Sequence, residues 1–298
     1  MGLDLFKLRV FVTVVDHRGY SAAAVHLGLS QSTVSFHVHG LERHLGVPLV
    51  RYEHRTVRLT AAGEHVYRSA KRMLRDEQQL TVSLRGGHGG RAALGVSMAF
   101  EQAFFMERTV SPYRREHSDV LLSLHFGHSL ALVEALEEHS VDLAYLIGWH
   151  MPAGLHFEFL HRARFALLVT PDHPLAREEV VTMEQVAEAG LIGALLDDVE
   201  QLHNDKILRE AGLGPGDIRL EVDGVQARML AAASGLGVVS IFLPPYAGPG
   251  DLGGLVELPV DRELPVVDVG LVTRRTDTPP WYVQELGDWI RTSTTTRG

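Results

Sequence analysis

The chain of 298 residues is long enough for two or three domains, and its 45% hydrophobic and 22% charged residues are typical of a globular protein. It contains no cysteine, which excludes disulfide frameworks, thiolate zinc sites and a cysteine nucleophile. The net charge of -9 is segregated, because residues 1–90 carry 12 Lys and Arg against 7 Asp and Glu, a net of +5, while residues 91–298 carry 16 against 30, a net of -14.

This segregation favours a polyanion-binding head on an acidic body, with a solvated imbalance of surface charge as the alternative. The amphipathic N-terminus, residues 1–7, lacks the basic-then-apolar layout of a signal peptide. No window approaches the roughly 18 consecutive apolar residues that a membrane helix needs. We therefore expect a cytoplasmic protein without a membrane partner.

Three short helices are predicted first. Apolar residues recur at three- and four-residue steps between residues 5 and 15, which predicts a helix that ends near Gly19. A second helix is predicted over residues 22–27. Ser30 is a strong N-cap residue, so a third helix is expected over residues 31–45. The loosely alternating residues 49–59 then predict a short hairpin, or wing.

A long helix is predicted from Thr60 to about Leu84. Its apolar residues follow a heptad pattern, at Val66, Ala70, Met73, Leu80 and Leu84. The pattern indicates pairing of two chains, and a surface helix packed on its own domain is the alternative. The glycine-rich residues 86–90 favour pairing, because this linker leaves the helix no neighbour in sequence to pack against.

Strands and helices alternate over the rest of the chain, which predicts parallel sheets with helices on both faces. The expected strands are residues 93–96, 120–125, 141–147, 165–169, 191–194, 218–222, 238–242 and 267–272. The expected helices are residues 102–115, 129–138, 183–189, 199–211, 224–234 and 281–292.

Several segments together closely resemble the LysR-type regulators. The most specific lie near the N-terminus: GYSAAAVHLGLSQSTVS at 19–35, LERHLGVPL at 41–49 and LTAAG at 59–63. Further matches are VDLA at 141–144, DHPLA at 172–176 and AASGLGV at 232–238. The chain departs from the family at Val50 and Tyr52, where Phe and Arg are usual, and at Phe36 and His37, where basic and amide side chains are common.

The resemblance implies an α+β head on an α/β body. The head is a winged helix-turn-helix over residues 1–59, followed by a long dimerisation helix and hinge over residues 60–90. Residues 91–298 are expected to form a two-lobed α/β domain like that of periplasmic binding proteins. Lobe one is expected over residues 91–162 and 265–293, and lobe two over residues 163–264.

Residues 31–45 are the expected recognition helix. Small polar side chains on its first turn allow a close approach to base edges, and free N–H groups at its start can bind a phosphate. The expected DNA contacts are Ser30, Gln31, Ser32, Thr33, Ser35 and His37 of this helix and, on phosphates, Arg51, Arg55 and Arg58 of the wing. His37 follows Thr33 by four residues and is expected on its exposed face, so that protonation below neutral pH strengthens DNA binding.

The resemblance also implies a small-molecule effector in a cleft between the lobes. The matching positions are Ser97, Met98, Ala99, Phe100, His128, Ser129, Ile147, Leu195, Leu196, Asp197, Gly224 and Gln226. Their side chains are largely apolar, so we expect a small, partly hydrophobic effector with one polar or acidic group. The remaining expectations are a homodimer through residues 60–85, a homotetramer, double-stranded DNA as partner, and RNA polymerase if the chain is an activator.

The alternative is a cytoplasmic small-molecule-binding protein or an enzyme whose N-terminal domain does not read DNA sequence. No nucleophile elbow, phosphate loop or dinucleotide fingerprint appears in the sequence. The histidine pairs His37 with His39 and His125 with His128 lack carboxylate partners at metal-ligand spacing. We therefore expect no catalytic activity, no cofactor and no metal.

Overall fold

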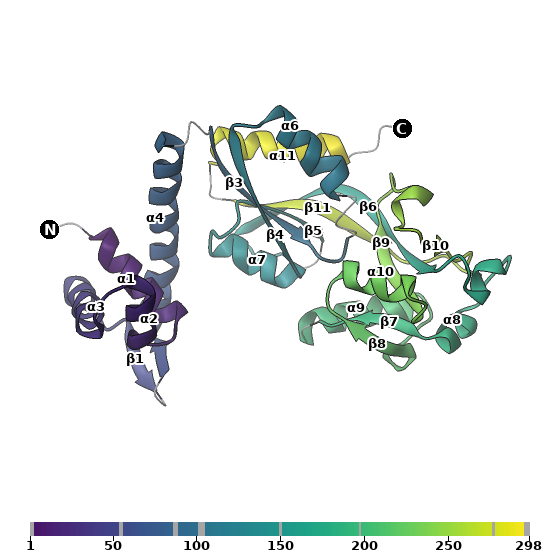
Figure 1. The fold of residues 1–298 in the computed structure, drawn as a ribbon, viewed down its shortest axis with the longest axis horizontal. Helices are drawn as coiled ribbons and strands as arrows, with labels where there is room; N and C mark the ends of the chain where they lie inside the picture. Colours follow the sequence, from purple (N-terminus) through teal and green to yellow (C-terminus); the bar gives the residue numbers. More distant parts are fainter. Residues whose placement is uncertain are drawn as a thin grey trace. The chain divides into compact units, whose positions relative to one another are not determined.

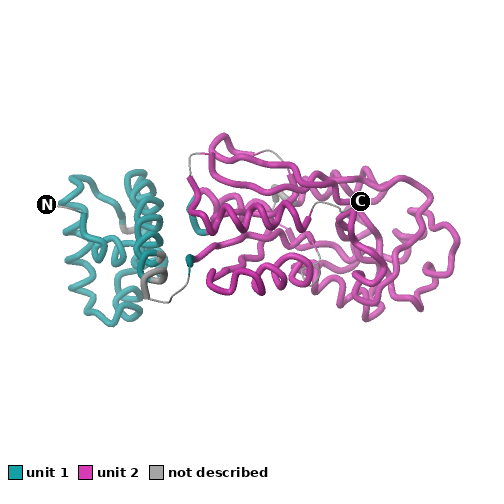
Figure 2. The backbone as a smooth tube through the Cα atoms, turned by 90° about the horizontal axis from the view of Figure 1, so that it is seen from above, with its two compact units in different colours: residues 1–90, 138–140 teal, residues 91–137, 141–298 magenta. Residues whose placement is uncertain are grey.

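The computed structural model describes residues 3–53, 56–85, 89–100, 105–148, 151–196, 198–275 and 278–294. The chain divides into two compact units, shown in teal and magenta in Figure 2. Unit 1 comprises residues 1–90 with 138–140, and unit 2 comprises residues 91–137 with 141–298. Each unit is described by itself.

The described residues of unit 1 form four helices and a two-stranded antiparallel ribbon (Figure 1). In chain order they are α1 (Leu5–Asp16), α2 (Tyr20–Leu27), α3 (Gln31–Leu45), β1 (Val50–Glu53), β2 (Thr56–Leu59) and α4 (Ala61–Arg85). Local chemistry fixes the helix ends. Asp4 caps α1 by accepting from the Phe6 amide, and the glycines at 28 and 46 end α2 and α3 in left-handed conformations.

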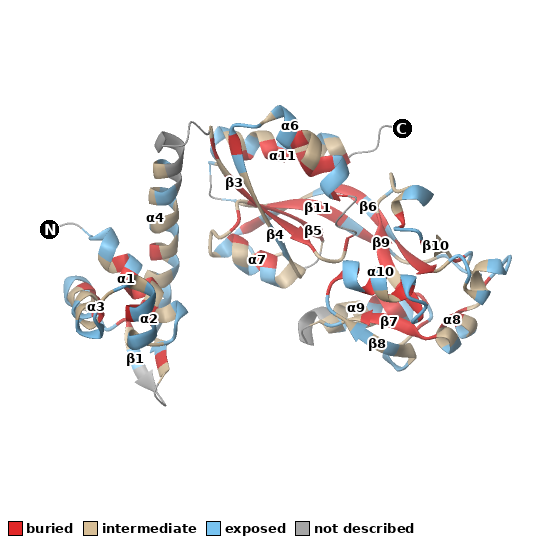
Figure 3. Cartoon of the chain, viewed as in Figure 1, coloured by how far each residue is buried: buried red, intermediate tan, exposed pale blue. Residues whose placement is uncertain are grey.

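The core of unit 1 lies between α1, α3 and the first half of α4. Leu8, Phe11 and Val14 of α1 pack with Val34 and Val38 of α3. These residues recur at three- and four-residue steps, so each helix buries one face. The described part of α4 beyond Ala70 contains no buried residue and is coloured tan and blue in Figure 3.

Unit 2 is built on a nine-stranded sheet in the order β4-β3-β5-β11-β6-β9-β7-β8, with β10 paired to β6. The strands are β3 (Gly90–Ser97), β4 (Val120–Gly127), β5 (Leu143–Ile147), β6 (Leu155–Val169), β7 (Leu191–Ala194), β8 (Ile218–Val222), β9 (Val238–Leu243), β10 (Val256–Glu257) and β11 (Val266–Arg274). Two long strands, β6 and β11, run through the middle of the unit (Figure 1) and are antiparallel to each other.

Six α-helices among the described residues cover unit 2: α6 (Ser111–Glu116), α7 (Ser129–Glu137), α8 (Met183–Ala189), α9 (Asp198–Glu210), α10 (Val225–Ala233) and α11 (Trp281–Thr294). The shorter helical turns are η1 (Met106–Val110), η2 (Pro174–Arg177), η3 (Pro215–Asp217) and η4 (Pro249–Asp251). Among the described helices, none is both long and apolar enough to cross a lipid bilayer.

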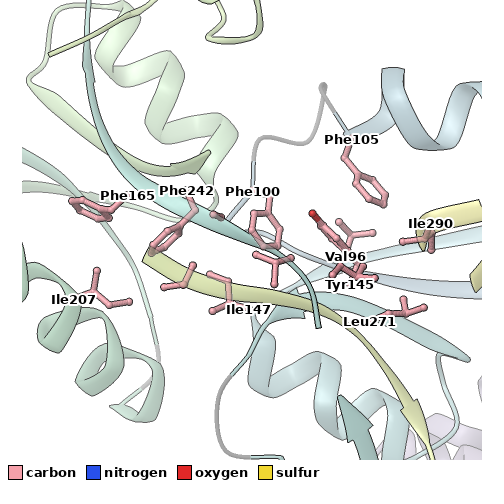
Figure 4. Close-up of a cluster of buried hydrophobic side chains, with 14 of the residues drawn as sticks. Val96, Phe100, Phe105, Tyr145, Ile147, Phe165, Ile207, Phe242, Leu271 and Ile290 are labelled. Carbon is pink, nitrogen blue, oxygen red and sulfur yellow. The ribbon is translucent and has the colours of Figure 1, made fainter. Parts of the chain in front are cut away.

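Alternation along the strands distributes the helices over both faces of the sheet. On β3, Leu94 and Val96 pack into the same cluster as Ile290 of α11, while Ala93 packs with Leu136 of α7. The α11 side holds the larger cluster, which extends from Ile290 and Leu271 at one end to Phe165 and Ile207 at the other (Figure 4).

The sequence predictions differ from this fold in three places. The strand expected from Phe165 begins ten residues earlier, at Leu155, because the first part of β6 pairs with β11. The strand directions are mixed: β3 with β5 and β7 with β8 and β9 are parallel, and β6 and β11 run against their neighbours. The helix expected from Gln102 starts outside the described residues, and Met106–Val110 is a π-helix.

The predicted heptad residues of the long helix also fall into two groups. Ala70 is buried in the core of unit 1 and Val66 packs against that core, so this part follows the alternative of packing on its own domain. Met73 and Leu80 are 40% and 60% exposed. The side chain of Leu84 lies outside the described residues.

Candidate DNA interface and effector cavity

The start of α3 is organised around the Ser30 hydroxyl. Its Oγ accepts from the Thr33 amide at 3.1 Å, as the sequence predicts for an N-cap. It also lies 2.8 Å from the Ser32 hydroxyl and 2.7 Å from the Thr33 hydroxyl. The three hydroxyls are thus held together at the positive end of a 15-residue helix.

Exposure separates the predicted contacts on α3. Gln31 and Ser32 are exposed, whereas Thr33 and Ser35 are half-buried. Gln31 and Ser35 share an open groove with Arg51 of the wing, and the groove is also lined by Tyr20, Ser21, His39, Glu42 and Val50. Polar residues of α2, α3 and β1 therefore face one concave surface of unit 1.

Glu42 connects α3 to the wing. Its Oε1 accepts from the Leu49 amide at 2.8 Å and from the Val50 amide at 3.3 Å, and its Oε2 lies 3.0 Å from His39 Nδ1. A carboxylate that accepts two backbone N–H groups holds the start of β1 against the helix. Glu42 was not singled out from the sequence, although it stands in the LERHLGVPL segment.

Two arginines lie opposite each other in the wing. Arg51 of β1 and Arg58 of β2 are direct cross-strand partners, and both side chains are exposed. Like charges directly opposite each other on neighbouring strands destabilise a ribbon. Arg55, the third arginine predicted to bind phosphate, lies outside the described residues.

His37 is less exposed than expected. Its ring is half-buried, its Nδ1 is buried without a hydrogen-bond partner among the described residues, and it meets Phe6 of α1 edge to face at 5.0 Å. Thr33 and His37 lie on the same face of α3. Near His37, one turn after Thr33, this face is covered by α1.

Unit 2 contains a cavity of about 90 Å³. Eight predicted effector residues line it: Ser97, Met98, Ala99, His128, Ser129, Ile147, Leu196 and Gly224. The cavity is completed by residues that are not among the predicted contacts, Phe165, Ala194, His203, Asn204, Ile207, Arg228, Ser240 and Phe242. Ile147, Phe165, Ile207 and Phe242 also belong to the buried cluster in Figure 4, so one wall is apolar.

Three predicted effector residues do not line the cavity. Phe100 packs into the core, 5.1 Å from the Tyr145 ring, and lines a separate small cavity. Leu195 is 55% exposed, and Gln226 is exposed because Val225 and Met229 turn their side of α10 to the core. Asp197, a fourth predicted effector residue, lies outside the described residues.

Arg228 is the charged residue that sequence reasoning missed. It lies on the buried stripe of α10 with Val225, Met229 and Ala232 and is 7% exposed. The stripe follows the i, i+3, i+4, i+7 spacing of one helix face, and this was the signal that could have placed Arg228 inside. Burial lowers the pKa of Arg228 to about 10, with an opposing effect of Asp223, so the side chain is cationic at neutral pH.

Two histidines line the cavity. Burial, and to a lesser degree the charge of Lys206, lowers the pKa of His203, which favours its neutral form. His128 Nε2 lies 3.2 Å from the Asp223 carboxylate, whose side chain is 63% exposed. Within the described residues, no group of three or more His, Cys, Asp or Glu side chains is arranged to hold a metal ion.

Comparison with known protein families assigns both units. Residues 5–64 match the bacterial regulatory helix-turn-helix protein model of the lysR family, and residues 85–295 match the LysR substrate binding domain model. The chain therefore belongs to the LysR family of bacterial transcriptional regulators.

Individual relatives are distant. The chain is 31% identical to the RuBisCO operon transcriptional regulator of Allochromatium vinosum, over 63% of each protein. It is 29% identical to the uncharacterized HTH-type transcriptional regulator YfeR of Shigella flexneri, over 98% of this chain and 94% of that one. The match thus spans less than two thirds of the first relative and nearly all of the second.

Solved structures share the fold. A full-length OxyR variant from Pseudomonas aeruginosa is similar with a TM-score of 0.66 and 20% identity, covering 100% of this chain and 99% of that chain. At this identity the similarity concerns the fold alone.

Proposed function

We propose that the chain is a sequence-specific DNA-binding transcription regulator whose DNA binding or activation responds to a small molecule in the cavity of unit 2. The observation that carries the proposal is the first turn of α3. Exposed Gln31 and Ser32 stand at a capped helix start in the same unit as the opposed Arg51 and Arg58.

The polar residues of α3 are assigned to the major groove. Gln31 can pair with an adenine edge, and Ser32 can hydrogen-bond to several bases. Ser30, Thr33 and Ser35 lie close enough to the helix start to contact phosphate or sugar. His37 is half-buried against Phe6, so we assign it no contact with DNA.

The arginines of the wing are assigned to phosphates. A phosphate near Arg51 and Arg58 would relieve the repulsion between these cross-strand neighbours. Arg55 keeps the same assignment on sequence grounds. Contacts of this kind set affinity and its salt dependence more than the choice of sequence.

The domain organisation extends the proposal. Residues 1–59 are the DNA-binding domain, residues 60–90 the dimerisation helix and hinge, and residues 91–298 the effector domain. Lobe one is residues 91–162 and 265–293, and lobe two is residues 163–264. The active form is a homodimer or homotetramer in the cytoplasm. RNA polymerase is a partner if the chain is an activator. The chain is not an enzyme.

DNA-binding measurements test the proposal. Fluorescence anisotropy with duplexes from the region upstream of the gene should detect tight binding to one of them. Gln31→Ala should reduce the preference for that duplex by about 1–3 kcal/mol. Arg58→Ala should weaken binding to all sequences alike and reduce the salt slope by about 1.

Arg177→Ala is the control, because Arg177 is an arginine of unit 2, remote in sequence from the proposed interface. Equal losses in all three variants would contradict the assignment. Absence of any preferred duplex, with intact binding of small molecules, would favour the alternative of a small-molecule-binding protein.

A further inference from the structure

The guanidinium of Arg228 occupies an unusual place in the cavity of unit 2. Its Nη1 donates to the Ser240 carbonyl at 3.0 Å, while its buried Nε has no hydrogen-bond partner among the described residues. A buried cation with unsatisfied donors is unfavourable unless an anion or further acceptors come close to it. The Ser240 carbonyl is neutral and satisfies one of five N–H donors.

The nearby carboxylate does not supply that anion. Asp223 favours the charged form of Arg228 from a distance, but its Oδ1 lies 3.2 Å from His128 and its side chain is largely exposed. Among the described residues that line the cavity, none is a carboxylate. Arg228 is therefore a buried positive charge at a cavity whose described lining residues carry no negative charge.

Two helix starts add to the positive potential. Ser129 is the first residue of α7 and Gly224 is the N-cap of α10, and both line the cavity. Each helix has nine residues. The N-terminal end of a helix carries a partial positive charge and unpaired N–H groups, which favour an anion.

The rest of the cavity is largely apolar. Ile147, Phe165 and Ile207 form a wall that is continuous with the buried cluster (Figure 4). A molecule bound there places hydrocarbon against this wall and its charge toward Arg228. The volume of about 90 Å³ limits it to a small ligand.

We infer that the effector is a small organic acid with one carboxylate, bound by Arg228, and an apolar remainder against Ile147, Phe165 and Ile207. The inference rests on the proposed function in taking this cavity as the effector site. Arg228 is the single Lys or Arg among the described residues that line the cavity, so one carboxylate matches its charge.

Thermal unfolding of the full chain tests this inference without knowledge of the natural effector. The probes are sodium butyrate, hexanoate, benzoate and phenylacetate, each compared with its amide at matched ionic strength. At least one acid should raise the Tm of the wild type by roughly 2 °C or more, and its amide should not. A panel in which no acid raises the Tm, or in which the amides act equally, would overturn the inference.

The variants Arg228→Met and Arg228→Lys test whether Arg228 is the residue that binds the acid. Arg228→Met should abolish the response to the acid, and the Tm without ligand should be equal to or above that of the wild type, because a buried charge is removed. Arg228→Lys keeps the charge and should keep a weaker preference for the acid over the amide. Arg115→Met, at an exposed arginine of the same unit, should respond as the wild type does.

An unchanged response in Arg228→Met would place the anion elsewhere and overturn the assignment. If that variant does not fold, Arg228→Lys decides, since loss of the preference for the acid in it would contradict a role of the charge. Acid binding that persists in a chain without sequence preference for DNA would contradict the proposed function and leave this inference standing. DNA binding without any response to acids would support the proposed function and contradict this inference.

Discussion

At the scale of single residues, Gly63 shows how closely the wing approaches α4. A Cβ at this position would lie 1.9 Å from the Leu49 carbonyl oxygen, a distance that requires the backbone to shift. The same carbonyl accepts from the Thr60 amide at 3.0 Å, so it is fixed in place. Gly63 therefore allows the junction between wing and helix to close.

Gly63→Ala should destabilise unit 1 by about 2 kcal/mol or more, because the junction must open to admit the methyl group. Urea unfolding followed by circular dichroism measures the change. Gly40→Ala is the matched control in the middle of α3, where the nearest atom to a Cβ would be 3.7 Å away. This variant should be more stable by about 0.4–1 kcal/mol, and equal effects of both substitutions would contradict the geometry.

A second residue-scale prediction concerns His161 of β6. Its Nε2 lies 2.8 Å from the buried Tyr145 hydroxyl, and burial lowers the pKa of His161 from its usual 6.5. Below about pH 6.5 the unfolded chain takes up a proton that the native chain resists, so the free energy of unfolding falls as pH falls.

His161→Gln removes this titrating group and keeps a polar partner for Tyr145. The fall in stability between about pH 7 and pH 5.5 should be smaller in the variant than in the wild type. Urea unfolding at several pH values, followed by fluorescence of Trp281 and Trp289 on α11, measures the difference. Parallel curves for the two proteins would exclude His161 as a source of the pH dependence.

At the scale of elements, Glu42 couples the recognition helix to the wing. Glu42→Ala leaves the Leu49 and Val50 amides without their acceptor, and unit 1 should lose about 2 kcal/mol of stability. Hydrogen exchange at these two amides should accelerate, and DNA affinity should fall. Glu42→Gln keeps an acceptor oxygen and should have a smaller effect; unchanged exchange in the Ala variant would contradict the role of Glu42.

The second half of α4 is the element assigned to pairing of two chains. Met73 and Leu80 are one heptad apart and are exposed in the single chain. Met73→Glu combined with Leu80→Glu should dissociate the dimer, because like charges would meet at a two-fold contact. Sedimentation velocity measures the assembly state, with Val180→Glu as a control at an exposed apolar residue of unit 2. Unchanged assembly of the double variant would refute this interface.

Most elements were predictable because their signals are local. Ser30 and the glycines at 28 and 46 define α3 from the sequence alone, and α8, β7 and β8 have their predicted bounds. The first part of β6 was not predicted, since its pairing with β11 brings together residues about 100 positions apart. Two of the five heptad residues of α4, Val66 and Ala70, were misassigned because heptad spacing does not distinguish a partner chain from the domain's own core.

The effector cavity was less predictable than the start of α3. Ser97, Ser129 and Ile147 lie at or just after strand ends and could be placed by resemblance, because strand ends converge at one edge of a sheet. Arg228 could not be placed by its type, since arginines on helices are mostly exposed. Its spacing from Val225 and Met229 was the one available signal, since these residues pack α10 on the sheet through the same helix face.

At the scale of the whole molecule, the distribution of charge agrees with the proposed roles, DNA binding by the N-terminal residues and effector binding by the rest of the chain. Residues 1–90 carry a net charge of +5 and residues 91–298 a net charge of -14. We expect acidic residues 91–298 to repel DNA, which favours contact through basic residues 1–90.

The central claim is that this chain reads DNA sequence through α3. The most direct test is to incubate the purified full chain with sheared genomic DNA and to sequence the fragments that it retains. A homodimer that reads base edges should retain a small set of fragments sharing an approximately two-fold symmetric motif, and Gln31→Ala should lose the enrichment of that motif. Retention without a shared motif, or the same motif and enrichment for Gln31→Ala, would contradict the claim.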